Sequence, residues 1–197
     1  TTEIYTLSLH DALPILGSVE YQYPNHLFQA GYFLDKKYYD ENTIDFKHLL
    51  LSEKNQSLLK DIQNSNSVGV HIRRGDYMTK QNLVIFGNIC TQKYYHDAIR
   101  IITEKVNDAV FYVFSDDISW VQTHLDIPNA VYVNWNTGES SIYDMYLMSS
   151  CKYNIIANST FSYWAARLNK KTNMVIYPSK WYNTFTPDIF PESWCGI

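Results

Sequence analysis

Short apolar runs alternate with amphipathic stretches over most of residues 67–178. The apolar runs have the length of strands and lie at 68–72, 109–114, 130–133, 153–157 and 174–177. Stretches with helical spacing of apolar residues separate them, at 91–106, 118–125, 142–150 and 161–168. Strands that alternate with helices indicate βαβ units, and unbroken apolar strands suit burial on both faces of a sheet. We therefore predict an α/β fold, a Rossmann-like parallel sheet within residues 67–197 that ends in a C-terminal tail.

The N-terminal part of the chain does not share this pattern. Residues 1–16 resemble a translated sequencing-adapter read-through, and we expect this segment to be a non-native artefact that packs poorly. Residues 17–66 are aromatic and polar, and the apolar spacing over 45–62 is compatible with one or two helices. We interpret residues 17–66 as a remnant of an N-terminal or inter-domain region, so that we expect a longer natural protein.

Composition narrows the function classes. Of the 197 residues, 46% are hydrophobic and 16% aromatic, which is enough for a packed core. The net charge of −4 argues against a nucleic-acid binder with a broad basic surface, so any anion site must be local. The three cysteines form no CxxC pair, which favours a reduced, cytoplasmic chain. The chain contains no apolar run long enough to predict a membrane span.

The most highly charged turn follows the first predicted strand. His71 and the adjacent pair Arg73 and Arg74 come directly before Gly75 and Asp76. Two neighbouring guanidiniums repel each other unless an anion lies near, and a guanidinium matches phosphate oxygens in two-point contact. A phosphate or diphosphate clamp is one interpretation. In the other, one arginine pairs with Asp76 and its neighbour is merely solvated.

Further polar clusters follow the second and fourth predicted strands. Residues 115–117 are Ser-Asp-Asp, and Asn158, Ser159 and Thr160 begin a predicted helix. The carboxyl ends of parallel strands share one edge of a sheet, where α/β proteins bind their ligands. Because a helix N-terminus favours a phosphate, the arginine pair and residues 158–160 would form a two-sided diphosphate cradle. Plain helix N-capping by Ser115 and Ser159 is the alternative.

Several familiar sites are absent or weak in this sequence. It has no GxxxxGK[ST] loop and no GxGxxG after a strand, which argues against a Walker-type ATPase and a dinucleotide dehydrogenase. Asp116 and Asp117 lack the alternating carboxylates of a DxD metal site, so we expect no metal. The tripeptide at 74–76, Arg-Gly-Asp, leaves an adhesion or scaffold module as a minor alternative.

Four short motifs stand in order along the predicted sheet. They are H-I-R-R-G-D-Y at 71–77, F-S-D-D at 114–117, D-M-Y-L-M-S at 144–149 and N-S-T-F-S-Y-W at 158–164. This ordered set resembles the bacterial α-1,2-fucosyltransferases, glycosyltransferase family 11, and so does the ending P-D-I-F-P-E-S-W at 187–194. Each motif alone is weak, whereas the ordered combination is specific. The resemblance runs from about residue 31 to residue 197.

The resemblance implies a fold, an activity and a set of site residues. The fold is GT-B, of which this chain would supply the C-terminal, nucleotide-sugar-binding half. The activity is an inverting, metal-independent transfer of L-fucose from GDP-β-L-fucose to the 2-hydroxyl of a galactose-terminated glycan, without a cofactor. The residues implied for catalysis and donor binding are His71, Arg73, Arg74, Asp76, Asp144, Asn158, Ser159, Thr160 and Phe161.

The implied roles follow the chemistry of GDP. Arg73 would bind the diphosphate with Arg74 in support, and residues 159–161 would complete the phosphate cradle. His71 and Asp144 would approach guanine and ribose, because a carboxylate can accept hydrogen bonds from both N1–H and the 2-amino group of guanine. The general base is unassigned; Asp76 is the nearest candidate, unless it only orients the arginines.

The chain also departs from the family. The Gly-rich G-x-G-N-Q-[LM]-F-Q motif of the family's N-terminal half is only echoed, without its glycines, by residues 25–29. We therefore expect the N-terminal domain and much of the acceptor site to be missing. A half-enzyme that binds the nucleotide sugar without turnover is the alternative function. We expect a cytoplasmic protein that can associate peripherally with the inner membrane.

Overall fold

The computed structural model describes residues 19–23, 26–30 and 46–197. The chain divides into two compact units, residues 1–43 with 187–189 and residues 44–186 with 190–197. In the first unit, β1 (Val19–Tyr23) and β2 (His26–Ala30) form an antiparallel hairpin that the sequence pattern does not predict. The predictions for residues 1–16 and for most of residues 17–45 lie outside the described residues.

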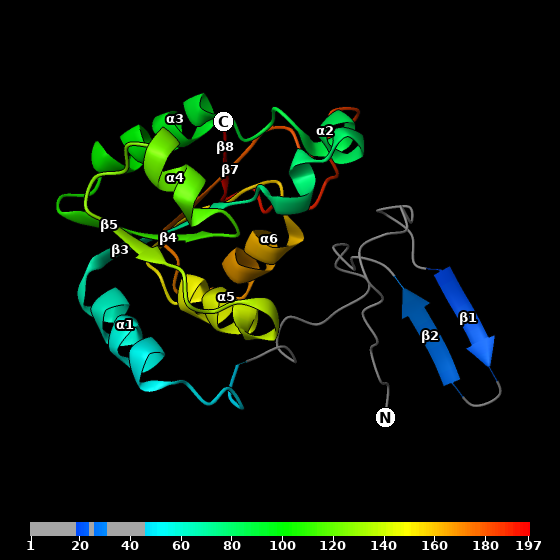
Figure 1. The fold of residues 1–197 in the computed structure, drawn as a ribbon, viewed down its shortest axis with the longest axis horizontal. Coiled ribbons are helices and arrows are strands. Elements are labelled where there is room, and N and C mark those ends of the chain that lie inside the picture. Colours follow the sequence, from blue (N-terminus) through cyan, green and yellow to red (C-terminus); the bar gives the residue numbers. More distant parts are fainter. Residues whose placement is uncertain (1–18, 24–25, 31–45) are drawn as a thin grey trace. The chain divides into compact units, whose positions relative to one another are not determined.

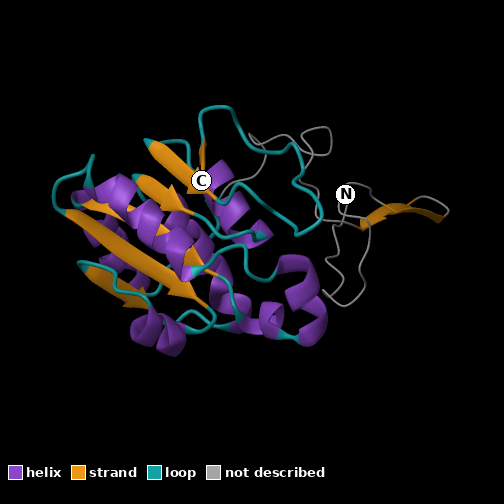
Figure 2. Ribbon diagram, turned by 90° about the horizontal axis from the view of Figure 1, so that it is seen from above, coloured by secondary structure: helices purple, strands orange, loops and turns teal. Residues whose placement is uncertain are grey.

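The second unit is built on a six-stranded sheet in which every strand pair is parallel. The strand order is β5-β4-β3-β6-β7-β8, so that β3 lies in the middle. Figures 1 and 2 show the strands and the helices around them in two views. This arrangement confirms the predicted Rossmann-like parallel sheet. The strands are β3 (Asn66–Ile72), β4 (Ala109–Ser115), β5 (Ala130–Val133), β6 (Tyr153–Ile155), β7 (Met174–Tyr177) and β8 (Cys195–Gly196).

Helices cover both faces of this sheet (Figure 1). One core cluster joins β3 and β4 to α3 (Gln92–Thr103) and α4 (Ile118–His124). The other joins the opposite face to α1 (Glu53–Asn64), α5 (Ser141–Ser149) and α6 (Thr160–Arg167). The loop after β3 contains a short 3₁₀ helix, η2 (Gly75–Met78), and then α2 (Lys80–Phe86). A second 3₁₀ helix, η3 (Gly138–Ser140), leads directly into α5.

The central strand β3 is buried along its whole length after its first residue. Val68, Val70 and Ile72 belong to the core cluster that includes α3 and α4. On the other face, a Cβ on Gly69 would lie 3.0 Å from Met148 of α5 and 2.9 Å from the Asn154 side chain. Glycine at position 69 therefore lets α5 pack closely over the strand that leads into the arginine turn.

The predicted strands and helices appear within a few residues of their expected bounds. Thr91 and Asp117 cap α3 and α4 with side-chain oxygens that accept from Tyr94 N and Trp120 N. Helix α2 was not predicted because its four apolar residues, 83–86, are consecutive and do not recur at helical spacing; none of its residues is buried. Among the described residues, no helix is both long and apolar enough to cross a membrane.

Candidate active site

The predicted polar clusters meet at the carboxyl edge of the sheet. Strand β3 pairs with β4 on one side and β6 on the other, so the turns that follow these three strands are neighbours. Arg73 and Arg74 lie in the turn after β3. Residues 115–117 lie at the end of β4 and in the turn that follows it. Residues 158–160 follow β6 and lead into the next helix. The expected convergence of the three clusters is confirmed.

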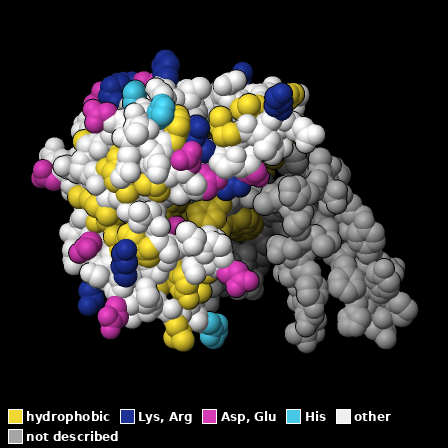
Figure 3. Space-filling view, in the orientation of Figure 1, with side chains coloured by type: hydrophobic (Ala, Val, Ile, Leu, Met, Phe, Trp, Pro, Cys, Tyr) yellow, Lys and Arg dark blue, Asp and Glu magenta, His cyan; other side chains and the backbone are white. Residues whose placement is uncertain are grey.

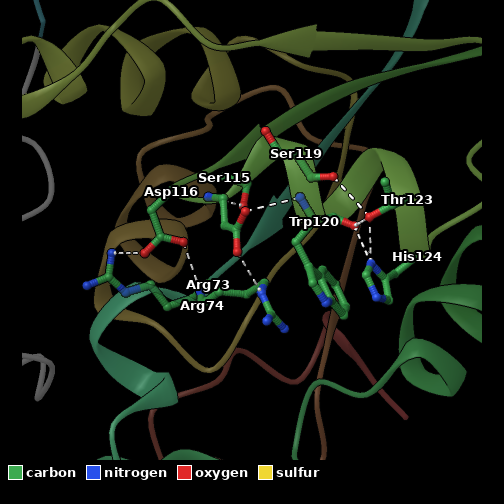
Figure 4. Close-up of polar contacts among 9 residues, drawn as sticks. Arg73, Arg74, Ser115, Asp116, Ser119, Trp120, Thr123 and His124 are labelled. Atoms are coloured by element: carbon green, nitrogen blue, oxygen red, sulfur yellow. Dashed lines mark hydrogen bonds and ion pairs between the residues drawn. The ribbon is translucent and has the colours of Figure 1, made fainter.

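Arg73 is held between two carboxylates. Its Nη2 lies 2.5 Å from Asp76 Oδ1. Its Nη1 lies 2.7 Å from Asp116 Oδ2 (Figure 4). The guanidinium also lies over the Tyr77 ring, 5.5 Å from the ring centroid. Because carboxylates from two different loops hold Arg73, its position is defined before any ligand binds. The two ion pairs leave some of its N–H donors for a ligand.

Arg74 is also paired, with different partners. Its Nε lies 3.2 Å from Asp117 Oδ2, and its guanidinium stacks on Trp120, 3.7 Å from the ring centroid (Figure 4). Its backbone N–H donates to Asp116 Oδ1 at 2.9 Å. The interpretation that one arginine is merely solvated is therefore wrong.

The prediction that the arginine pair requires an external anion is also wrong. Three carboxylates, those of Asp76, Asp116 and Asp117, lie against the two guanidiniums and offset their repulsion. In the space-filling view, Lys/Arg and Asp/Glu side chains lie interleaved in the middle of the visible face, beside hydrophobic side chains (Figure 3). An anionic ligand at this site must therefore compete with, or add to, charges that the protein already supplies.

Glycine at position 75 permits this arrangement. A Cβ built on Gly75 would overlap Asp116 Oδ2, the oxygen that pairs with Arg73. Any larger residue would push the Asp116 carboxylate away from the arginine turn.

His71 points to the face of the sheet opposite α3. The residue is 5% exposed, and the centroid of its ring lies 5.0 Å from that of the Phe161 ring of α6. Burial, helped by the nearby Arg73 cation, lowers the pKa of His71 from 6.5 to about 3, so the imidazole is neutral at physiological pH. Within the described part of the chain, His71 Nδ1 is buried without a hydrogen-bond partner. A buried polar atom of this kind is available to a ligand.

Asp144 lies on the same face, in the first turn of α5, and is 9% exposed. Burial raises the pKa of Asp144 from 3.8 to about 7, although a hydrogen bond from Asn136 partly lowers it. Asn136 Nδ2 donates to Asp144 Oδ1 at 2.6 Å and also to Asn55 Oδ1 at 3.1 Å. Asn55 Nδ2 donates back to Asn136 Oδ1 at 3.0 Å, and Trp135 Nε1 donates to Asn55 Oδ1 at 2.7 Å.

This amide network was missed by sequence reasoning. Asn55 is 1% exposed and comes from α1, yet it supports a carboxylate on α5 through Asn136. Neither asparagine belongs to a motif, and 81 positions separate them in the chain. The only signal in the sequence is that a polar residue occupies the apolar side of a helical stretch.

Asn158 is engaged within the protein. Its side-chain amide donates to the backbone carbonyls of Phe86 at 3.2 Å and Trp181 at 3.1 Å, and its Oδ1 accepts from Cys90 Sγ at 3.3 Å. These contacts tie the end of α2 and the C-terminal segment to the start of α6. A role of the Asn158 side chain in phosphate binding stays a prediction.

The serines do not behave as plain helix caps. Ser159 is the N-cap residue of α6, but its side chain makes no capping hydrogen bond. Ser115 Oγ accepts from Asp117 N at 3.0 Å, and Asp117 is the residue that caps α4. The capping alternative is therefore wrong for both serines. The N-terminus of α6, with Thr160 and Phe161, lies beside the arginine turn, since Tyr77 Oη donates to Asn158 O at 2.9 Å.

Among the residues that the structure describes, no group of three or more His, Cys, Asp or Glu side chains is arranged to hold a metal ion. The carboxylates that converge here, on Arg73 and Arg74, serve as partners of those cations.

The Rossmann-like sheet gathers arginines, a buried carboxylate and a helix N-terminus at its carboxyl edge, which is where α/β proteins of this kind bind their ligands. Comparison with known proteins gives the family. The profile described as glycosyl transferase family 11 matches residues 18–197. The chain belongs to glycosyltransferase family 11.

Three curated relatives illustrate the similarity. An α-1,2-colitosyltransferase of Escherichia coli is 35% identical over 196 residues, which cover 92% of this chain and 63% of that protein. The O-antigen biosynthesis glycosyltransferase WbnK of Escherichia coli is 44% identical over 122 residues, 61% of this chain and 40% of that protein. A galactoside α-(1,2)-fucosyltransferase 2 of Pongo pygmaeus is 28% identical over 163 residues, 76% of this chain and 48% of that protein.

The chain thus spans less than two thirds of the length of these relatives. Among solved structures, that of the fucosyltransferase NodZ from Bradyrhizobium aligns with a TM-score of 0.40 at 18% identity, over 57% of this chain and 39% of that chain.

Proposed function

We propose that this chain is the donor-binding part of a fucosyltransferase that moves L-fucose from GDP-β-L-fucose to the 2-hydroxyl of a terminal galactoside. Family membership and the names of the relatives support the reaction class. In the proposed inverting step, the acceptor's 2-hydroxyl oxygen bonds to C1 of fucose while the bond from C1 to the β-phosphate oxygen breaks. GDP leaves with the electron pair, and the hydroxyl proton passes to a base.

The observation that carries the proposal is the set of groups gathered at the carboxyl edge of the sheet. Asp144 and His71 lie on the α5/α6 face, and Arg73 stands at the end of β3 beside the start of α6. Together these groups offer partners for the three parts of GDP, which are the base, the ribose and the diphosphate. Neutral His71 and the ionised form of Asp144, which prevails above about pH 7, offer hydrogen bonds to guanine and ribose, and Arg73 offers charge to the diphosphate.

The protein's contribution to catalysis would be electrostatic. As the bond to fucose breaks, negative charge develops on the β-phosphate of GDP, and a cation held rigidly in place stabilises that charge without reorganisation. Asp76 and Asp116 hold Arg73 in this way. Their ion pairs support an orienting role for Asp76 over that of the general base. In this proposal no metal takes part.

Nucleotide binding tests the proposal directly. Replacing Arg73 by alanine should weaken binding of GDP by about 1.5–3 kcal/mol, the scale of a hydrogen bond to a charged group. Arg100→Ala is the matched control, because Arg100 is a 61% exposed arginine of α3 that is paired with Asp97 and Glu104. Titration calorimetry of the 197-residue chain would contradict the role of Arg73 if both variants bind GDP like the wild type.

A second candidate function is a nucleotide-sugar-binding half-enzyme without turnover. This candidate concerns the 197-residue chain by itself, which spans 63%, 40% and 48% of the lengths of the three relatives. An assay of GDP release from GDP-β-L-fucose with lactose as acceptor separates the two candidates. Release that depends on lactose would refute the half-enzyme, whereas tight GDP binding without such release would support it.

A further inference from the structure

The hydrogen bonds that reach Asp144 begin at side chains from two other parts of the fold. Trp135 and Asn136 follow β5, at the carboxyl edge of the sheet. Asn55 lies in the first turn of α1, where its backbone N–H donates to the N-cap residue Ser52 at 3.3 Å. Asp144 lies in the first turn of α5. The proposed function uses only Asp144 and leaves the other three side chains without a role.

The indole N–H of Trp135 sets the direction of these hydrogen bonds. An indole N–H can only donate, so the atom 2.7 Å away must be the carbonyl oxygen of Asn55. Asn55 therefore turns its Nδ2 toward Asn136, whose Oδ1 accepts at 3.0 Å. A flip of either carboxamide would place two donors or two acceptors against each other, so both orientations are fixed.

The orientation of Asn136 in turn fixes one oxygen of Asp144. Asn136 Nδ2 carries two hydrogens; it donates to Asn55 Oδ1 at 3.1 Å and to Asp144 Oδ1 at 2.6 Å. Within the residues that the structure describes, Asp144 Oδ2 makes no hydrogen bond, so this oxygen stays open to a ligand. The carboxylate is therefore held in one orientation before a ligand arrives.

A carboxylate in a fixed orientation can distinguish between purine bases. Guanine presents two neighbouring donors, N1–H and the 2-amino group, whereas hypoxanthine, the base of IDP, presents only N1–H. A site built to accept a hydrogen bond from a substrate N–H rejects the analogue that lacks this group, because the buried acceptor is left unpaired. A carboxylate that is free to rotate can adapt to either base and discriminates less.

We propose that Asn136, held in its orientation by Asn55 and Trp135, is a positioning residue that sets the selectivity of the site for guanine. The inference rests on the proposed function, in which ionised Asp144 binds guanine. Asn136 acts through Asp144: it holds Oδ1 by a hydrogen bond and so orients the carboxylate toward the base.

Two substitutions break these hydrogen bonds at different points. Asn136→Leu removes the donor to Asp144 and keeps a side chain of similar size. Trp135→Phe keeps an aromatic ring and removes the N–H that donates to Asn55, so that its effect on Asp144 must pass through both carboxamides. Lys54→Met is the matched control, because Lys54 Nζ lies 3.7 Å from the centroid of the Trp135 ring and its loss leaves the indole N–H in place.

Calorimetry with GDP and IDP at pH 8, above the Asp144 pKa of about 7, measures the selectivity. We expect the wild-type chain to bind GDP about tenfold or more tightly than IDP, the scale of one hydrogen bond to a charged group. Asn136→Leu and Trp135→Phe should each lower this ratio by about threefold or more, with Lys54→Met unchanged. In an Asp144→Asn background, Trp135→Phe should leave the ratio unchanged, because the carboxylate through which it acts is gone.

The ratio separates positioning from a merely structural role. Equal losses of GDP and IDP affinity in the variants, or a wild-type ratio in both, would overturn the proposal. Trp135→Phe decides alone if circular dichroism shows that Asn136→Leu is unfolded. Equal binding of GDP and IDP by the wild-type chain would overturn this inference and leave the proposed function standing. A wild-type chain that binds no GDP would overturn the proposed function, and this inference with it.

Discussion

Replacing Asp144 by asparagine should make the folded chain more stable at alkaline pH. Asp144 is 9% exposed, and burial raises the pKa of its carboxyl from 3.8 to about 7. Asparagine has the same shape, and its carbonyl oxygen can still accept the 2.6 Å hydrogen bond from Asn136. The substitution therefore removes a buried charge and leaves the packing nearly unchanged.

The sign of the pH dependence follows from proton binding. The folded chain holds the Asp144 proton up to about pH 7, whereas the unfolded chain releases it above about pH 4. The unfolded state thus binds fewer protons between these values, and the wild-type contribution to stability is lost as pH rises from about 4 to about 7. The difference of about 3 pKa units, at about 1.36 kcal/mol each, sets an upper limit of about 4 kcal/mol.

Urea unfolding followed by tryptophan fluorescence at pH 4 and pH 8 measures this effect. The stability of Asp144→Asn relative to the wild type should rise by about 2–4 kcal/mol between the two pH values, a large fraction of a typical total stability. Glu139→Gln, which removes an exposed carboxylate from η3 next to α5, is the control and should follow the wild type at both pH values. A difference between Asp144→Asn and the wild type that is the same at both pH values would refute the reasoning.

Three further predictions concern ligand binding and local packing. If ionised Asp144 binds guanine, GDP should bind about tenfold more weakly at pH 6 than at pH 8, and calorimetry of Asp144→Asn should show no such dependence. Gly75→Ala should weaken GDP binding by about 1 kcal/mol or more, because the Cβ of the alanine displaces Asp116 from Arg73. Unchanged GDP affinity would mean that the Arg73–Asp116 ion pair does not position the arginine. Asn158→Ala should lower the free energy of unfolding by about 2–3 kcal/mol, since two backbone carbonyls lose their donor. If the folded variant binds GDP with wild-type affinity, the Asn158 side chain has no phosphate-binding role.

The local sequence pattern was sufficient to predict most of the sheet and its helices. Apolar runs of strand length became β3, β4, β5, β6 and β7, because a strand buried on both faces must be apolar throughout. Thr91 and Asp117 cap helices through hydrogen bonds that span only three residues, so they too could be recognised in the sequence. Helix α2 and strand β8 could not, since the first buries no residue and the second is two residues long.

The sequence by itself determined which chemical groups stand at the end of each strand, but the tertiary structure decided their partners and charge states. The arginine pair was visible at once, whereas its pairing with Asp116 and Asp117 joins residues more than 40 positions apart and depends on β4 lying next to β3. The raised pKa of Asp144 likewise depends on burial and on an amide network that begins in α1. Ion pairs and pKa values are set by distance and by exclusion of water, and the order of the strands, not the order of the residues, fixes both.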